Sequence, residues 1–337
     1  MIPNPLYPSL TRISDLETAS YEINEVDRAE WDTGDFVVTE VTSNGIGSAR
    51  IELPNGRTVA VFPGYRVVGA FGRRFATLEL TGSWEAIQPD GRVDILSACG
   101  LVGRLTSGSA YVTQPIEAKY VGHVVRRGKK VTMRGSVTPP PRLELKTPIV
   151  LIIGTSMSAG KTTAARVVVR QLRELGCEVV GAKLTGCGRY RDVLSMKDAG
   201  AQHILDFVDV GLPSTVVPEP DFREAAGELL ARIAAFGADV AVIEAGASPL
   251  EPYNGGVAVE LIQRNIALTI VAASDPYAVL GLQEAFGHKA DLVTGPTANT
   301  MAGAQLVDRL TGVPTLNFSA PAAAEELRNL LAERFSD

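Results

Sequence analysis

Residues 154–163 read Gly-Thr-Ser-Met-Ser-Ala-Gly-Lys-Thr-Thr, a run of small residues that ends in a lysine and two threonines. An apolar run, 149–153, precedes it, and a segment with the apolar spacing of a helix follows it. A loop of small residues between a strand and a helix directs backbone N–H groups and the positive end of the helix dipole toward an anion. The sequence therefore predicts a phosphate-binding loop formed by Thr155, Ser156, Met157, Ser158, Ala159, Gly160, Lys161, Thr162 and Thr163.

Two side chains of this loop carry the expected chemistry. Lys161 is placed to reach the β- and γ-phosphates of a nucleoside triphosphate, and the Thr162 hydroxyl is placed to coordinate Mg²⁺. We therefore expect ATP and Mg²⁺ as cofactors. The spacing differs from the usual motif by one residue, because Gly154 stands one position before the expected glycine and Thr155 occupies its place. The alternative is an ordinary strand-to-helix turn with a solvated surface lysine.

From Pro148 onward, short apolar runs alternate with segments of helical periodicity. This alternation is typical of a mostly parallel sheet covered by helices. Together with the loop it predicts an α/β fold, a P-loop NTPase domain over residues 148–337. The expected strands are 149–153, 179–184, 240–244, 268–273, 292–294 and 315–317, and the expected helices are 162–175, 220–236, 276–286, 298–310 and 322–335.

Charged side chains end two of the expected strands. Ligands bind at the carboxyl ends of the strands in open α/β sheets. Glu244 is the best placed carboxylate for Mg²⁺, and a buried carboxylate with a purely structural partner is the alternative. Lys183 is expected to face a transferring phosphoryl group or an anionic substrate. Asp192 is expected to supply a further metal ligand or to orient a nucleophile, ahead of Asp198. The predicted catalytic residues are Lys161, Lys183 and Glu244.

Two loops that follow these strands are rich in glycine and polar side chains, and we predict that they contact the substrate. Arginine favours bidentate capture of carboxylate or phosphate groups, although a surface loop with solvated charges has the same composition. The predicted substrate contacts are Lys183, Arg189, Arg191, Tyr253 and Asn254. A third loop, 294–299, either frames the nucleotide base or only caps a helix.

Before residue 138 the pattern changes to short alternating runs separated by turn residues, which predicts a smaller, mostly-β barrel or sandwich domain over residues 35–137. An acidic arm, 1–34, precedes it, and a proline-rich linker, 138–147, follows it. The expected strands are 36–41, 58–62, 76–80 and 130–133, and the expected hairpin turns are Asn44-Gly45, Asn55-Gly56, Asp90-Gly91 and Arg127-Gly128.

The composition excludes several classes of protein. A formal net charge of −6 argues against general nucleic-acid binding. No apolar run approaches the roughly 20 residues of a membrane helix, and the first residues lack the pattern of a signal peptide, so we expect a cytoplasmic protein. Three cysteines and three histidines without ligand spacing predict reduced thiols and no zinc site. The expected partners are a small-molecule substrate and a second copy of the chain in a homodimer.

Residues 154–162 resemble the offset phosphate-binding loop of dethiobiotin synthetase, which has the same extra residue. Lys183 is similar to that family's substrate-contacting lysine, and 244–247 is similar to its metal-binding glutamate followed by small residues. Residues 244–262 resemble the P-loop family that includes D-glutamate N-acetyltransferase. The resemblance covers about 148–318 and implies one broad class of P-loop proteins. Serines at 156 and 158 and a leucine at 184 differ from dethiobiotin synthetase, which argues against its substrate, diaminopelargonate.

Three functions follow from these features. The leading hypothesis is an ATP- and Mg²⁺-dependent enzyme, a kinase or a ligase, that acts on a small carboxylate- or amine-bearing metabolite. The second is a coenzyme A-dependent N-acyltransferase that acts on an amino acid, in which the loop grips the phosphates of the coenzyme. The third is a nucleotide-gated binding module without appreciable turnover.

Overall fold

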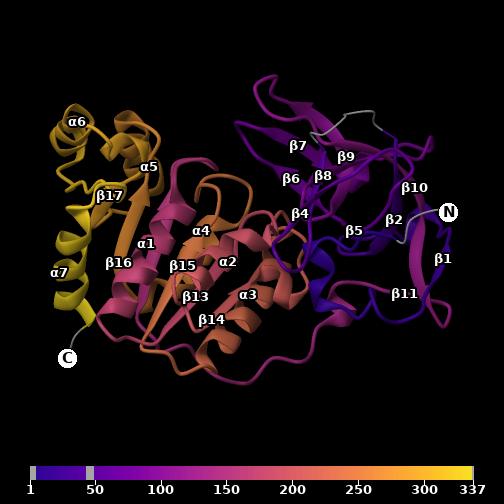
Figure 1. Cartoon of the computed structure of the whole chain (residues 1–337), viewed down its shortest axis with the longest axis horizontal. Coiled ribbons are helices and arrows are strands. Elements are labelled where there is room, and N and C mark those ends of the chain that lie inside the picture. Colours follow the sequence, from indigo (N-terminus) through magenta and orange to yellow (C-terminus); the bar gives the residue numbers. More distant parts are fainter. Residues whose placement is uncertain (1–4, 43–48, 336–337) are drawn as a thin grey trace. The chain divides into compact units, whose positions relative to one another are not determined.

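The computed structural model describes residues 5–42 and 49–335 (Figure 1). The chain forms two compact units. The β unit consists of residues 1–139, 187–191 and 207–218, and the α/β unit consists of residues 140–186, 192–206 and 219–337. The predicted domains are continuous in sequence, whereas the compact units interleave, because two short loops of the second half belong to the β unit.

The α/β unit is built on a sheet of six strands in the order β14-β13-β15-β12-β16-β17 (Figure 1). Each neighbouring pair is parallel. The strands are β12 (Ile149–Gly154), β13 (Val179–Thr185), β14 (His203–Asp206), β15 (Val240–Ala245), β16 (Ile266–Ala272) and β17 (Leu292–Thr294). The predicted α/β class with a parallel sheet is therefore confirmed, and β12, which leads into the phosphate-binding loop, lies inside the sheet.

Among the described residues, the α-helices that accompany this sheet are α1 (Lys161–Glu174), α2 (Tyr190–Asp198), α3 (Glu219–Ala234), α4 (Gly255–Ile262), α5 (Pro276–Phe286), α6 (Met301–Thr311) and α7 (Ala323–Phe335). Short 3₁₀ helices of this unit occur at Gln263–Asn265 and Pro296–Ala298, whereas the 3₁₀ helix Phe207–Val210 belongs to the β unit. One core cluster joins the apolar face of α1 to alternate residues of the central strands, such as Val150 and Val242, and to Leu327 of α7. Because strand side chains alternate between faces, this cluster defines the face of the sheet that α1 covers.

Four elements of the α/β unit differ from the sequence prediction. Residues 315–317 are not a strand, and only an isolated bridge pairs Thr315 with Val293. Pro314 precedes this segment and has no N–H for a ladder. The edge strand β14 and the short helices α2 and α4 were not predicted, because four to nine residues are too few to show a clear period.

The β unit contains a ring of strands. β2 pairs with β5, β5 with β9, β9 with β8, β8 with β10, and β10 with β2. These five pairings close on themselves, as in a small barrel. The strands are β1 (Glu22–Asn24), β2 (Phe36–Val41), β3 (Arg50–Glu52), β4 (Thr58–Ala60), β5 (Arg66–Phe71), β6 (Arg73–Phe75), β7 (Leu80–Ser83), β8 (Arg92–Ser97), β9 (Leu101–Gly108), β10 (Ile116–Arg126) and β11 (Lys129–Lys130). Short 3₁₀ helices lie at Ser9–Ile13, Arg28–Glu30, Trp84–Ala86 and Arg134–Ser136.

The predicted turns of the β unit are only partly correct. Asn55-Gly56 joins the antiparallel pair β3 and β4, and Arg127-Gly128 joins β10 and β11. Both residues of the second turn have positive φ, 51° and 72°, as a hairpin turn of the I′ type requires. Asp90-Gly91 precedes β8 but joins no hairpin, and Asn44-Gly45 lies outside the described residues. Residues 76–79 form the connection between β6 and β7, so only Leu80 of the predicted strand 76–80 is in a strand, and β11 ends at Lys130.

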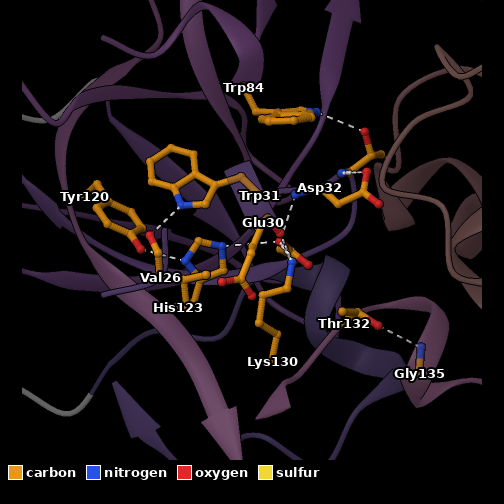
Figure 2. Close-up of polar contacts among 12 residues, drawn as sticks. Val26, Glu30, Trp31, Asp32, Trp84, Tyr120, His123, Lys130, Thr132 and Gly135 are labelled. Carbon is orange, nitrogen blue, oxygen red and sulfur yellow. Dashed lines mark hydrogen bonds and ion pairs between the residues drawn. The ribbon is translucent and has the colours of Figure 1, made fainter. Parts of the chain in front are cut away.

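A buried polar cluster lies inside the β unit (Figure 2). The Tyr120 hydroxyl is 2.6 Å from His123 Nδ1, and His123 Nε2 is 3.3 Å from Asp35 Oδ2. Lys130 Nζ is 2.6 Å from the same oxygen. Burial raises the pKa of Tyr120 to about 12, so its hydroxyl stays protonated. His123 is completely buried and packs beside Trp31.

Candidate nucleotide-binding site

The loop 154–163 connects the carboxyl end of β12 to the first turn of α1. Gly160 precedes the helix with φ 101°, a left-handed conformation that glycine adopts without strain. Lys161, the first residue of α1, is buried and donates a hydrogen bond from Nζ to the carbonyl oxygen of Ser156, 2.6 Å away. The ammonium is thus folded back over the loop, where the sequence predicts that phosphate oxygens bind.

The geometry explains why the glycine stands one residue early. A Cβ atom at Gly154 would lie 2.8 Å from both Cγ and Cδ of Lys161 and 3.0 Å from its Nζ. The lysine side chain therefore lies directly across Gly154, at the end of β12. A residue with a side chain at this position would displace Lys161.

We predict that Gly154→Ala keeps its fold but binds nucleotide about tenfold more weakly than the wild type, because overpacking of this kind costs about 1–3 kcal/mol. The clash falls on a flexible side chain rather than on backbone, so Lys161 moves and β12 stays. Isothermal titration with a nucleoside triphosphate measures the affinity. Gly281→Ala on α5, where an added Cβ meets open space, is the matched control. Equal affinity in both variants would contradict this assignment of Gly154.

Acidic and basic groups converge at the carboxyl ends of β13 and β15. Thr162 Oγ1 donates to Glu244 Oε2 over 3.1 Å. Lys183 Nζ and Asp192 Oδ2 form an ion pair at 2.5 Å. Lys183 and Glu244 are register partners in adjacent strands, so these two pairs belong to one region. Glu244 lies two residues after Val242 in β15, so both side chains are on the face of the sheet that α1 covers. The carboxylate therefore lies on the side of the helix that carries Thr162.

Burial sets the protonation behaviour of this region. Burial lowers the pKa of Lys161, against the attraction of Glu244. Burial also raises the pKa of Glu244, and the cations Lys183 and Lys161 partly offset this effect. Both charged forms are therefore held at a cost when no ligand is bound. A phosphate group beside the lysines and a divalent cation beside the carboxylate would each stabilise a charge that the fold has already removed from water.

Glycines give the Lys183 side chain its space. A Cβ atom at Gly246 would lie 3.0 Å from Lys183 Cε and 2.2 Å from the carbonyl oxygen of Thr185, and one at Gly186 would lie 3.1 Å from Lys183 Cε. Ala247, which follows Gly246, has a positive φ of 57°, which is uncommon for a residue with a side chain. The chain thus turns sharply after β15 and leaves room for the lysine.

The other predicted substrate contacts have different surroundings. Arg189 and Arg191 belong to the β unit, where Arg189 Nε lies 3.9 Å from Glu52 Oε2 and Arg191 is exposed. Tyr253 is completely buried, so its side chain is part of the core. Asn254 takes a left-handed conformation, φ 60°, directly before α4. The sequence showed that all four residues lie in polar loops, but it could not show which of their side chains are buried.

A pocket opens beside the loop 154–163. It has a volume of about 200 Å³. Gly160 and Thr163 of the loop line it together with residues that follow β17, including Asn299, and with a segment near 318. The pocket is lined by Gly160, Thr163, Ala164, Thr294, Gly295, Pro296, Asn299, Asn317, Phe318 and Ser319. The predicted loop 294–299 therefore lines a pocket beside Gly160 and Thr163, and its neighbour 317–319 was missed.

Asp206 is a further acidic residue that sequence reasoning missed. It ends β14 as the register partner of Lys183 and is completely buried. The short apolar run before it, closed by an acid, was the available signal. Among residues 5–42 and 49–335, no group of three or more histidine, cysteine or acidic side chains forms a metal cage. A Mg²⁺ ion here would thus depend on phosphate oxygens and water as well as on Thr162 and a carboxylate, as phosphate-bound Mg²⁺ commonly does.

Within the described part of the chain, no helix has both the length and the apolar content needed to span a bilayer.

Comparison with known proteins does not assign the chain to a family. No protein-family model matches the sequence, and no curated protein matches it. Among solved structures, it is similar to chloroplast FtsY from Physcomitrella patens, with 13% identity and a TM-score of 0.38 over 58% of this chain and 68% of that one. It is also similar to the signal recognition particle 54 kDa protein from Aeropyrum pernix K1 in complex with GDP, with 19% identity and a TM-score of 0.37 over 59% of this chain and 48% of that one. HypB from Helicobacter pylori in complex with nickel has 18% identity and a TM-score of 0.36, over 56% and 86% of the two chains.

Proposed function

We propose that the α/β unit binds a nucleoside triphosphate with Mg²⁺ and transfers its terminal phosphoryl group to a small carboxylate- or amine-bearing acceptor. One observation carries this proposal: Lys161 and Thr162 of the loop lie in one buried region with Glu244, Lys183 and Asp192. Phosphoryl transfer is catalysed mainly by positioning and by charge stabilisation, and these are the groups that such catalysis uses. The offset loop with Lys183 and Glu244 also supports a place in the dethiobiotin synthetase-like class.

The loop residues hold the phosphates in this proposal. Lys161 exchanges its hydrogen bond to the Ser156 carbonyl for hydrogen bonds to oxygens of the β- and γ-phosphates. The negative charge of these oxygens stabilises the buried ammonium. Thr162 and Glu244, already hydrogen-bonded to each other, supply the protein oxygens for Mg²⁺. When bound, the ion neutralises charge on the β- and γ-phosphates and orients them.

Lys183 and Asp192 serve the transfer itself. The ammonium of Lys183 stabilises negative charge on the transferring group, and its 2.5 Å ion pair with Asp192 holds it in place. Asp192 orients the acceptor or accepts its proton as the new bond to phosphorus forms. The roles of Arg189, Arg191 and Asn254 in acceptor binding stay predictions.

ATP is the nucleotide that we propose. The pocket beside Gly160 offers the two amide side chains of Asn299 and Asn317, whose donors and acceptors can pair with the edge of a purine base. The same groups could pair with guanine, so titration with ATP and with GTP decides the preference. A tighter constant for GTP would correct the nucleotide and leave the phosphoryl-transfer proposal in place.

Lys183→Ala tests the function. We expect this variant to bind Mg-ATP with nearly unchanged affinity and to lose about 10²–10³-fold in turnover, the usual cost of removing one preorganised charge-stabilising donor. Turnover is measured as ADP formation with panels of small carboxylates and amines. Lys197→Ala, an exposed lysine of α2, is the matched control and keeps full turnover.

Two results would overturn the proposal in favour of its rivals. Consumption of acetyl-coenzyme A without ADP formation would show N-acyl transfer. Tight nucleotide binding with negligible turnover on every acceptor, together with salt-sensitive binding of a macromolecule, would show a nucleotide-gated binding module.

A further inference from the structure

Two cysteines far apart in sequence have neighbouring sulfur atoms inside the β unit. The Sγ atoms of Cys99 and Cys187 are 3.9 Å apart. Cys99 is 0% exposed and Cys187 is 4% exposed. Neither cysteine is in a disulfide bond, and the same holds for Cys177, which is less buried and belongs to the α/β unit. The sulfurs of a disulfide lie roughly 2.05 Å apart, so these two sulfurs must move about 2 Å closer together to form one.

The backbone holds both cysteines in place. Cys99 lies in the tight turn between β8 and β9, which is closed by a 3.0 Å hydrogen bond from Gly100 N to Ser97 O. Gly100 has φ +94°, a conformation that suits glycine. Cys187 forms an isolated antiparallel bridge with Ser214. The proximity of the two sulfurs is therefore set by fixed backbone on both sides.

A buried carboxylate anchors the residues that follow Cys187. Glu52, completely buried, accepts hydrogen bonds from the Tyr190 backbone N–H at 2.7 Å and from the Ser9 hydroxyl at 2.6 Å. Ser9 begins the 3₁₀ helix Ser9–Ile13, and the next residue, Leu10, donates its N–H to the carbonyl oxygen of Cys99 at 3.1 Å. One network of hydrogen bonds thus connects the surroundings of both cysteines.

We propose that Cys99 and Cys187 are an oxidisable dithiol pair that a peroxide converts into an intramolecular disulfide. One thiol loses its proton and attacks a peroxide oxygen, the O–O bond breaks, and a sulfenic acid and water form. The second thiol then attacks that sulfur, the S–O bond breaks, the S–S bond forms, and a second water leaves. The two sulfurs together lose two electrons, which the peroxide gains.

The burial of the pair determines how it reacts. Burial raises the pKa of the Cys99 thiol well above its ordinary value, and the thiolate is the reactive form. Oxidation is thus slow at neutral pH and accelerates as the pH rises. A small oxidant such as hydrogen peroxide suits a buried pair better than a bulky disulfide reagent does.

Thiol titration after unfolding, under non-reducing conditions, tests the proposal. The reduced chain has three thiols, and we expect one after treatment with hydrogen peroxide and three again after dithiothreitol. Cys177→Ser should fall from two thiols to none, whereas Cys99→Ala and Cys187→Ala should each keep two. Peptide mapping of the oxidised wild type should show Cys99 joined to Cys187. The oxidised chain should also resist urea more strongly, because the bond closes a long loop in the unfolded state.

Other patterns would overturn the proposal. The oxidation conditions are first set so that a model dithiol is oxidised reversibly. A wild-type chain that keeps three thiols under these conditions would show that the pair does not react. Loss of thiols that maps to Cys177, or to disulfides between two chains, would show that exposure rather than the 3.9 Å contact directs the oxidation. The two alanine variants duplicate each other, so poor folding of one leaves the test intact.

Discussion

Lys161→Met is expected to weaken nucleoside-triphosphate binding by about a hundredfold or more and, without nucleotide, to raise the unfolding temperature above that of the wild type. The loss of affinity follows because charge-assisted hydrogen bonds contribute about 1.5–3 kcal/mol each, and the lysine makes more than one with the phosphates. The gain in stability follows from burial. Lys161 is 3% exposed and its pKa is lowered, so the folded chain holds the ammonium at a cost. Methionine keeps the apolar stem and removes the charge.

The pH dependence of this difference has a fixed sign. A lysine whose pKa is lowered by folding costs stability at pH values below its folded pKa, where it is charged in both states. The cost disappears as the pH rises to the ordinary value of 10.5, above which neither state is charged. The stability advantage of Lys161→Met should therefore be full at neutral pH and should shrink in alkaline buffer. Thermal unfolding with and without Mg-ATP measures both effects.

The matched control is Lys197→Met, which removes an exposed lysine from α2. This variant should keep the affinity of the wild type and its unfolding temperature. If Lys161→Met instead binds Mg-ATP as the wild type does, the loop 154–163 is an ordinary strand-to-helix turn. If the variant is merely misfolded, its unfolding temperature falls rather than rises.

The sequence was sufficient for the parts of this site that depend on local pattern. The strand before Gly154 and the helix after Gly160 have clear periods, and the structure has both within one or two residues of the prediction. Lys183 and Glu244 were chosen because they end apolar runs, and the parallel register of β13 and β15 makes them neighbours. Local pattern and tertiary structure agree here because the same strands form the core.

Other features required contacts that no local pattern contains. Asn317 was assigned to a strand, but the structure places it in the pocket beside Gly160. Tyr253 lies in a polar loop, yet its ring is completely buried. The chain after β13 was read as one substrate loop, but residues 187–191 belong to the β unit, and Arg189 there lies near Glu52. Each of these outcomes depends on which distant residues a loop meets.

Glu244→Gln is expected to lose Mg²⁺-dependent turnover by about a hundredfold or more, because the neutral amide is a poor ligand for a hard cation that prefers carboxylate oxygens. The fold should not suffer, since the amide oxygen of the replacement can still accept the 3.1 Å hydrogen bond from Thr162. Turnover is measured as ADP formation over a range of Mg²⁺ concentrations. Glu260→Gln, which removes an exposed carboxylate from α4, is the matched control and keeps the wild-type response.

The same substitution should stabilise the ligand-free protein, and the sign again follows from burial. The pKa of Glu244 is raised in the folded chain. Below the ordinary value of 4.5 the carboxyl is protonated in both states and costs no stability, and the cost appears as the pH rises from there through the folded pKa, above which the buried group is charged. The advantage of Glu244→Gln is therefore absent in acid and appears toward neutral pH. A variant that is less stable than the wild type at pH 7 would contradict this account of the buried carboxylate.

Lys161 and Glu244 also attract each other, and this makes the two stability effects interdependent. Each single variant removes one buried charge but leaves the other without that partner, so part of the gain is lost. The double variant removes both charges together. Its gain in unfolding free energy should exceed the sum of the two single gains, and the excess measures the attraction between the two groups. Simple additivity would contradict an attraction between the buried lysine and the buried carboxylate.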